Sequence, residues 1–111
     1  MLMVNKERQL SNSWYLDKEK KNKLFIHFIF TPDGLGIEEF CVSYWLMIDE
    51  EPQEIVRYDC SAREKLHIHL LFCKPPVKRT IDREINYETM EECVNEIEKN
   101  WRKWLLKFKE L

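Results

Sequence analysis

Hydrophobic and polar residues alternate through much of the middle of the chain, and this period of two is typical of β-strands. Comparable β-type runs cover residues 24–30, 39–48, 55–59 and 66–72. Turn-forming residues separate them, and Pro75-Pro76 is predicted to end the sheet. In the second run, every second residue is apolar and is predicted to face the core: Phe40, Val42, Tyr44, Leu46 and Ile48. We therefore predict a four-stranded, mostly antiparallel sheet within residues 24–72.

The pattern changes to a helical period from residue 87 to the end of the chain. Asn86 is placed to cap such a helix, glutamates follow it and lysines crowd the end, as the helix dipole favours. One apolar stripe runs along it: Tyr87, Met90, Val94, Ile97, Trp101, Trp104 or Leu105, and Phe108. We predict one long C-terminal helix over residues 86–111, packed on one face of the sheet, and hence an α+β fold.

Residues 1–23 are predicted to form an N-terminal arm that ends in a polar linker. The segment around Trp14 and Tyr15 is interpreted either as a strand or as an arm that docks on the sheet. A chain of 111 residues has room for one hydrophobic core. We therefore expect residues 1–111 to form a single domain.

The overall composition is 44% hydrophobic and 34% charged, which is too apolar for a disordered chain and too charged for a membrane protein. No stretch reaches the roughly 18 apolar residues that a spanning helix needs. The first residues also lack the apolar region of a secretory signal. We expect a cytoplasmic protein with no membrane partner.

The four cysteines are widely spaced and form no Cys-x-x-Cys motif, so they indicate neither a zinc ribbon nor a redox pair. We interpret them as reduced thiols. The net charge of −2 gives no overall basic field for nucleic acid, although lysines and arginines gather in three local clusters.

The residues with the most suggestive chemistry lie on the third and fourth predicted strands. If the apolar residues of both strands face the core, then Arg57, Asp59, His67 and His69 share the opposite face. A hairpin closed near residues 60–65 would make them cross-strand neighbours. We predict that two imidazoles, a carboxylate and a guanidinium converge there.

Such a cluster has several interpretations. One histidine could act as base and the other as acid in metal-independent phosphodiester cleavage, with Arg57 stabilising the phosphate charge. His67, His69 and Asp59 could instead ligate a divalent metal, or the cluster could be a docking patch for phosphate or RNA. The plain alternative is a polar, half-exposed strand face. Trp45, on the face away from the helix, is interpreted as a stacking platform for bases or as part of a dimer seam.

The order of these features resembles that of a known family. Tyr44-Trp45, an acidic turn, the segment Val56-Arg57-Tyr58-Asp59-Cys60, the strand His67-Ile68-His69 and a closing helix together resemble small proteins of the TumE type. These are toxin components of prokaryotic toxin–antitoxin modules and their uncharacterised relatives. The resemblance, over about residues 40–110, implies a toxin that acts on RNA or translation and a helix-turn-helix antitoxin partner.

From these observations we expect a toxin-like protein that acts on RNA, with no cofactor. His67 and His69 are the acid and base candidates, Asp59 orients a histidine, and Arg57 and Trp45 bind substrate. The candidate partners are RNA, an antitoxin protein and a second copy of the chain. The alternative is a non-enzymatic module for protein interaction or dimerisation.

Overall fold

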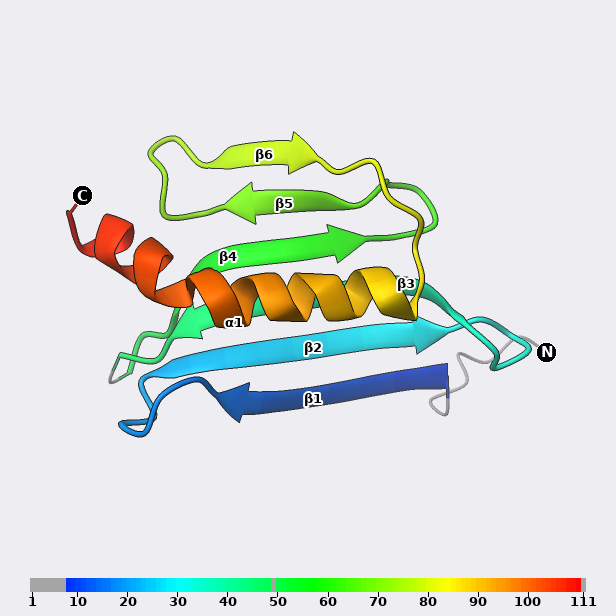
Figure 1. The fold of residues 1–111 in the computed structure, drawn as a ribbon, viewed down its shortest axis with the longest axis horizontal. Helices are drawn as coiled ribbons and strands as arrows, with labels where there is room; N and C mark the ends of the chain where they lie inside the picture. Colours follow the sequence, from blue (N-terminus) through cyan, green and yellow to red (C-terminus); the bar gives the residue numbers. More distant parts are fainter. Residues whose placement is uncertain (1–7, 49, 111) are drawn as a thin grey trace.

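The computed structural model, which describes residues 8–48 and 50–110, contains an antiparallel sheet followed by one helix (Figure 1). The sheet is a meander in which each strand pairs with the next along the chain. Its strands are β1 (Gln9–Tyr15), β2 (Asn22–Phe30), β3 (Ile37–Leu46), β4 (Gln53–Cys60), β5 (His67–Leu70) and β6 (Val77–Thr80). The helix, α1, spans Tyr87–Glu110.

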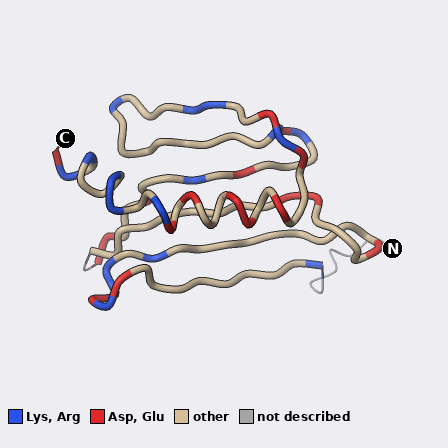
Figure 2. Tube along the Cα trace, in the orientation of Figure 1, with Lys and Arg blue, Asp and Glu red and all other residues tan. Residues whose placement is uncertain are grey.

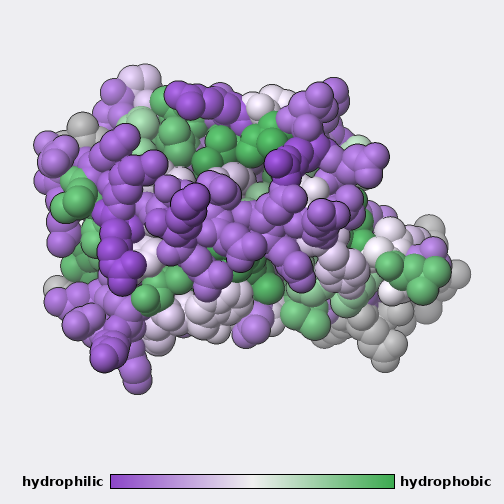
Figure 3. All heavy atoms as spheres, in the orientation of Figure 1, coloured by the Kyte–Doolittle hydropathy of each residue, from purple (hydrophilic) through white to green (hydrophobic). Residues whose placement is uncertain are grey.

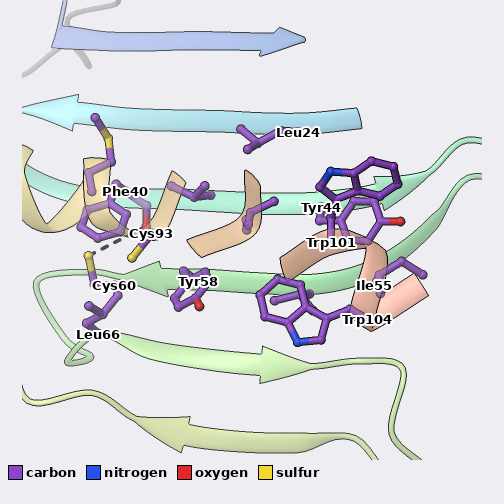
Figure 4. Packing of buried hydrophobic residues seen from close by; sticks show 14 of the residues in the cluster. Leu24, Phe40, Tyr44, Ile55, Tyr58, Cys60, Leu66, Cys93, Trp101 and Trp104 are labelled. Carbon is purple, nitrogen blue, oxygen red and sulfur yellow. Dashed lines mark hydrogen bonds between the residues drawn. The ribbon is translucent and has the colours of Figure 1, made fainter. Parts of the chain in front are cut away.

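The helix α1 lies across one face of the sheet and packs mainly on β3 and β4 (Figure 1). The predicted apolar stripe forms this interface, since Met90, Ile97, Trp101 and Trp104 are all buried. Figure 4 shows the two tryptophans over the strands, with the ring of Trp101 edge-on to that of Tyr44 at a centroid distance of 6.1 Å. The α+β prediction is confirmed, with the helix on a single face.

The sheet has six strands, so the prediction of four was wrong. The two additional strands, β1 and β6, are the edges of the sheet. The segment around Trp14 and Tyr15 was interpreted either as a strand or as a docking arm, and it is a strand, whereas β6 was not predicted at all. Edge strands bury little, and both of these carry mostly exposed side chains, so alternation was weak in their sequences. Residues 9–15 are therefore a strand within the predicted arm, and the sheet continues beyond Pro75-Pro76.

The predicted cap of the helix is present. The side-chain Oδ1 of Asn86 accepts a hydrogen bond of 2.8 Å from the backbone N–H of Thr89. Acidic residues lie near this end and basic residues near the other, where Lys107 and Lys109 occupy the last turn (Figure 2). Both features satisfy the unpaired ends and the dipole of an α-helix.

Replacing Asn86 by alanine is expected to lower the free energy of unfolding by about 1 kcal/mol, because the N–H of Thr89 loses its acceptor. Chemical denaturation followed by circular dichroism measures this change. The matched control is Asn95→Ala, at an exposed position within α1, where alanine is the better helix former and no loss is expected. Equal destabilisation by both variants would contradict the capping role.

Two further features of the described residues concern the cysteines and the apolar character of the helix. The four cysteines are free thiols. Within residues 8–48 and 50–110, the helix is not apolar enough to cross a membrane.

Candidate functional site

The face of the sheet opposite α1 carries the predicted cluster. In the β4–β5 hairpin, Asp59 lies directly across from His67 and Arg57 lies directly across from His69. Directly paired residues of an antiparallel sheet share a face. The alternate residue Tyr58 is buried in the core beneath α1, so these four side chains point the other way. The four residues are cross-strand neighbours on one face, as the alternation of the two strands indicated.

A cleft of about 350 Å3 opens over this hairpin. This volume is at the small end of ligand pockets, so it suits a phosphate group or a hydrated metal ion better than a large organic ligand. Three strands and the β4–β5 loop line it with Arg57, Asp59, Cys60, Ser61, Glu64, His67, His69 and Lys78.

The carboxylate of Asp59 is the centre of the cluster. Its Oδ1 lies 2.5 Å from Nε2 of His67 and 3.7 Å from Nε2 of His69. Its Oδ2 accepts a hydrogen bond of 2.7 Å from Nε of Arg57. The two oxygens of Asp59 thus have different partners. The hydrogen bond from Arg57 to Oδ2 holds the carboxylate in the orientation that directs Oδ1 at the histidines.

Arg57 bridges two carboxylates. Besides Asp59, its Nη1 donates a hydrogen bond of 2.7 Å to Oε1 of Glu54, whose side chain is only 17% exposed. Burial alone would lower the pKa of Arg57, but Glu54 and Asp59 raise it above its usual value. Arg57 was predicted to bind substrate, yet in this structure its main contacts orient Asp59.

His67 is almost fully enclosed, with 5% of its side chain exposed. Both of its ring nitrogens face oxygen atoms, since Nδ1 lies 2.8 Å from the backbone carbonyl of Lys65 and Nε2 lies beside Asp59. A carbonyl only accepts hydrogen bonds, so Nδ1 must carry a proton. In this arrangement neither nitrogen of His67 points to substrate.

His69 is the histidine on the side of the open cleft, with 17% of its side chain exposed. Burial, followed by the positive charge of Arg57, lowers the pKa of His69 below its usual 6.5. A neutral imidazole at pH 7 can accept a proton or bind a metal ion. Of the two histidines predicted as acid and base, His69 is the one that has a nitrogen available for this chemistry.

Trp45 does not join the cluster, although it lies on the same face. Its neighbour across β2 is Lys23, and its ring meets that of Phe25 edge-on at a centroid distance of 6.1 Å. Nζ of Lys23 lies 4.9 Å from the ring centroid of Tyr15 and 5.0 Å from that of Phe25. We call Tyr15, Phe25 and Trp45 the aromatic platform.

The row of paired residues that contains Asp59 continues across the sheet to Cys41, His27 and Ser11. Burial, followed by the charge of Asp59, raises the pKa of the Cys41 thiol to about 11, so it stays protonated and is a poor nucleophile. Nδ1 of His27 lies 2.6 Å from Oγ of Ser11, so one nitrogen of its ring already has a hydrogen-bond partner on β1.

Two residues of the cleft, Glu64 and Lys78, were missed by sequence reasoning, and so was Glu54, the partner of Arg57 beside it. In a regular strand, residues three apart point to opposite faces, so the spacing of Glu54 and Arg57 gave no signal. The shift in the β3–β4 register between Tyr44 and Trp45 brings the two side chains together. Glu64 lies in the β4–β5 loop, 3.4 Å from Nε2 of His67 and 3.4 Å from Nζ of Lys78. Lys78 could not be found because its strand, β6, was interpreted as a loop.

A second cavity, of about 470 Å3, lies on the helix side of the sheet. Its walls include Tyr58, Leu66 and Ile81 from the sheet side and Cys93 from α1. On that face Figure 3 shows hydrophobic atoms beside the helix, over the part of the sheet that contains β5 and β6. One helix is narrower than six strands, so this flank of the sheet has no helix above it within the described residues.

Comparison with known proteins gives one match. A family model described as a domain of unknown function, DUF7718, matches residues 3–111. No curated protein and no solved structure matches the chain.

Proposed function

The chain belongs to the DUF7718 family, a domain of unknown function, and we propose that it is a toxin-like protein that acts on RNA. In this proposal, single-stranded RNA lies on the open face of the sheet. Its bases stack on the aromatic platform and one phosphodiester enters the cleft beside Asp59, His67 and His69.

The observation that carries the proposal is that the aromatic platform and the cluster share one face. Trp45 lies four residues along β3 from Cys41, which is roughly 13 Å at about 3.3 Å per residue. Cys41 pairs with Asp59 on the neighbouring strand, so the aromatic platform lies at about this distance from the cluster. Sequence-tolerant recognition of single strands uses aromatic stacking next to groups that contact the phosphates. A few nucleotides of an extended strand cover this distance.

The electrostatics of the cleft suit a phosphate at its mouth. Lys78 is 54% exposed and its only partner among the described residues is Glu64, at 3.4 Å. Arg57 lies deeper and is 31% exposed. Arg57 and Lys78 flank the histidines. A phosphate can replace Glu64 as the partner of Lys78 and leave the ion pair between Arg57 and Asp59 intact.

Cleavage of RNA at this site would use its 2′-hydroxyl. The hydroxyl loses its proton, its oxygen forms a bond to the adjacent phosphorus, and the bond from phosphorus to the 5′ oxygen breaks as that oxygen is protonated. His69 is suited to the first step, because its neutral ring can accept the proton.

The resemblance to TumE-type toxins supports the same assignment. Arg57, Asp59, His67 and His69 occupy the places of that family's pattern, and all four line the cleft. In this proposal an antitoxin protein is a further partner.

Replacing Trp45 by alanine is expected to weaken binding of a single-stranded RNA oligonucleotide about tenfold or more, since stacking contributes roughly 1–3 kcal/mol per base. Fluorescence anisotropy at two salt concentrations measures the affinity, and binding should weaken at the higher one. The matched control is Trp45→Phe, which keeps an aromatic ring and should retain most of the affinity. Unchanged affinity in Trp45→Ala, or no RNA binding by the wild type, would count against the proposal.

The alternative is a non-enzymatic module for protein interaction or dimerisation. The cavity beside α1 favours it, because its floor includes the apolar residues Leu66 and Ile81 and its rim the charged residues Arg83, Glu92 and Glu96, a combination that is common where a protein partner binds. A stable complex with a protein partner or a second copy, combined with no effect of His69→Gln in any RNA assay, would favour this alternative.

A further inference from the structure

We propose that Asp59, His67 and His69 form a binding site for one divalent transition-metal ion, with Zn2+ as the best match. Two imidazole nitrogens and one carboxylate oxygen are ligands that Zn2+ takes in catalytic sites. The site is inferred from geometry alone and needs no RNA. Its role in cleavage rests on the proposed function.

The ligand atoms of the three residues converge on one point. All three lie within 4.8 Å of one another, and the individual separations from Oδ1 of Asp59 are 2.5 Å to His67 and 3.7 Å to His69. Ligands at about 2.1 Å in a tetrahedral zinc site are about 3.4 Å apart. The observed separations bracket that value, so small side-chain movements bring all three atoms to bonding distance.

The contacts of His67 carry the inference further. Its Nδ1–H donates to the carbonyl of Lys65, so Nε2 is the nitrogen that faces the carboxylate of Asp59, at 2.5 Å from Oδ1. Either a proton or a metal ion can lie between these two atoms, and a divalent ion that binds there displaces the proton. A ring N–H donated to a backbone carbonyl is the usual support of a metal-binding histidine.

Asp59 is supported in the same manner. Arg57 holds Oδ2 and is itself held by Glu54, so Oδ1 is directed at the two histidines. Ligating carboxylates in metal sites are commonly fixed by such outer partners. Two carboxylates lie next to the imidazole of His67, since Oδ1 of Asp59 and Oε2 of Glu64 are 2.5 Å and 3.4 Å from its Nε2. The charge beside the ring nitrogens is therefore negative, although Arg57 and Lys78 balance it over the cleft as a whole.

The surroundings indicate a site with room for reaction. Three protein ligands leave at least one position of a tetrahedral ion for water, and the cleft above them holds about 350 Å3. Such an ion lowers the pKa of its bound water, which then supplies hydroxide near neutral pH. With the ion bound, that hydroxide would take the place of the free ring of His69 as the base in the proposed RNA cleavage.

The test titrates chelator-treated full-length chain with Zn2+ by isothermal titration calorimetry, in the absence of RNA. We expect one ion per chain, and at least about tenfold weaker binding by Asp59→Asn and by His69→Gln. The matched control is His27→Gln, on the same face of the sheet but two strands away from Asp59. It should bind as the wild type does. Far-ultraviolet circular dichroism establishes that each variant is folded.

A parallel titration with Co2+ identifies the ligands by visible absorption. We expect d–d bands without the thiolate charge-transfer band that cysteine ligands produce. The proposal is overturned if the wild type binds no Zn2+, if both variants bind as the wild type does, or if the thiolate band dominates.

The fates of the two proposals are distinguishable. One Zn2+ bound through Asp59 and His69 with no RNA cleavage would support the metal site and reject the proposed function. Cleavage that survives complete chelation but is lost in His69→Gln, together with no binding of Zn2+ in the titration, would support the proposed function and reject the metal site.

Discussion

Replacing His69 by glutamine is expected to lower the rate of RNA cleavage about 10²–10⁴-fold, the usual contribution of a proton-transfer group. His69 is the cluster residue whose ring faces the cleft with a nitrogen available, and its lowered pKa keeps that ring neutral at pH 7. Glutamine is polar and of similar size but takes up no proton. Single-turnover cleavage of a labelled RNA measures the rate, and growth after induced expression in a bacterial host measures the effect in cells.

The matched control for this prediction is again His27→Gln, because His27 is hydrogen-bonded to Ser11 and lies outside the cleft. The control should cleave RNA at the wild-type rate and arrest growth as the wild type does. Equal rates for His69→Gln and the wild type would show that the cleaving activity does not use this cluster.

Replacing Trp101 by alanine is expected to lower the free energy of unfolding by about 3–5 kcal/mol, the cost of removing a large aromatic side chain from a packed core. Trp101 is 6% exposed and joins α1 to β3 through its contact with Tyr44. Its ring also lies under the guanidinium of Arg102, at 4.4 Å from Cζ to the ring centroid, and alanine loses that contact as well. For a domain whose total stability is about 5–15 kcal/mol, this is a large fraction. Urea denaturation followed by tryptophan fluorescence and circular dichroism measures it.

Leu106→Ala is the matched control, since it shortens an apolar residue of the same helix that is 63% exposed. It should change the unfolding free energy by less than about 0.5 kcal/mol. A small loss for Trp101→Ala would contradict the packing of α1 on β3.

Arg57, Asp59, His67 and His69 have roles in the structure that differ from those predicted from the sequence. His67 and His69 were predicted as an equivalent pair of acid and base, and Arg57 as a contact to phosphate. Both histidines line the cleft, but the side chain of His67 is only 5% exposed and is hydrogen-bonded to the carbonyl of Lys65, whereas that of His69 is 17% exposed. Arg57 orients Asp59. The pair is therefore asymmetric, which suits a metal site with one supported and one accessible imidazole.

The edge strands mark the limit of prediction for the fold. The central strands and the helix were predictable because each buries one face, and burial imposes a period on the sequence. β1 and β6 bury little, so their sequences carry no such period. The prolines before β6 added a misleading signal, since proline is common at the edge of a sheet as well as at its end.

The sequence by itself predicted that Arg57, Asp59, His67 and His69 share the face opposite the helix, provided that the apolar residues of both strands face the core, because side-chain direction alternates along a strand. Only the tertiary structure decided which of them approach one another, through the register of the β4–β5 hairpin and the contacts of Glu54 and of the Lys65 carbonyl. The tertiary structure also decided that Trp45 packs against Phe25 and does not join the histidine cluster. Distances between strands depend on pairing and on loop conformation, and neither leaves a periodic trace in the chain.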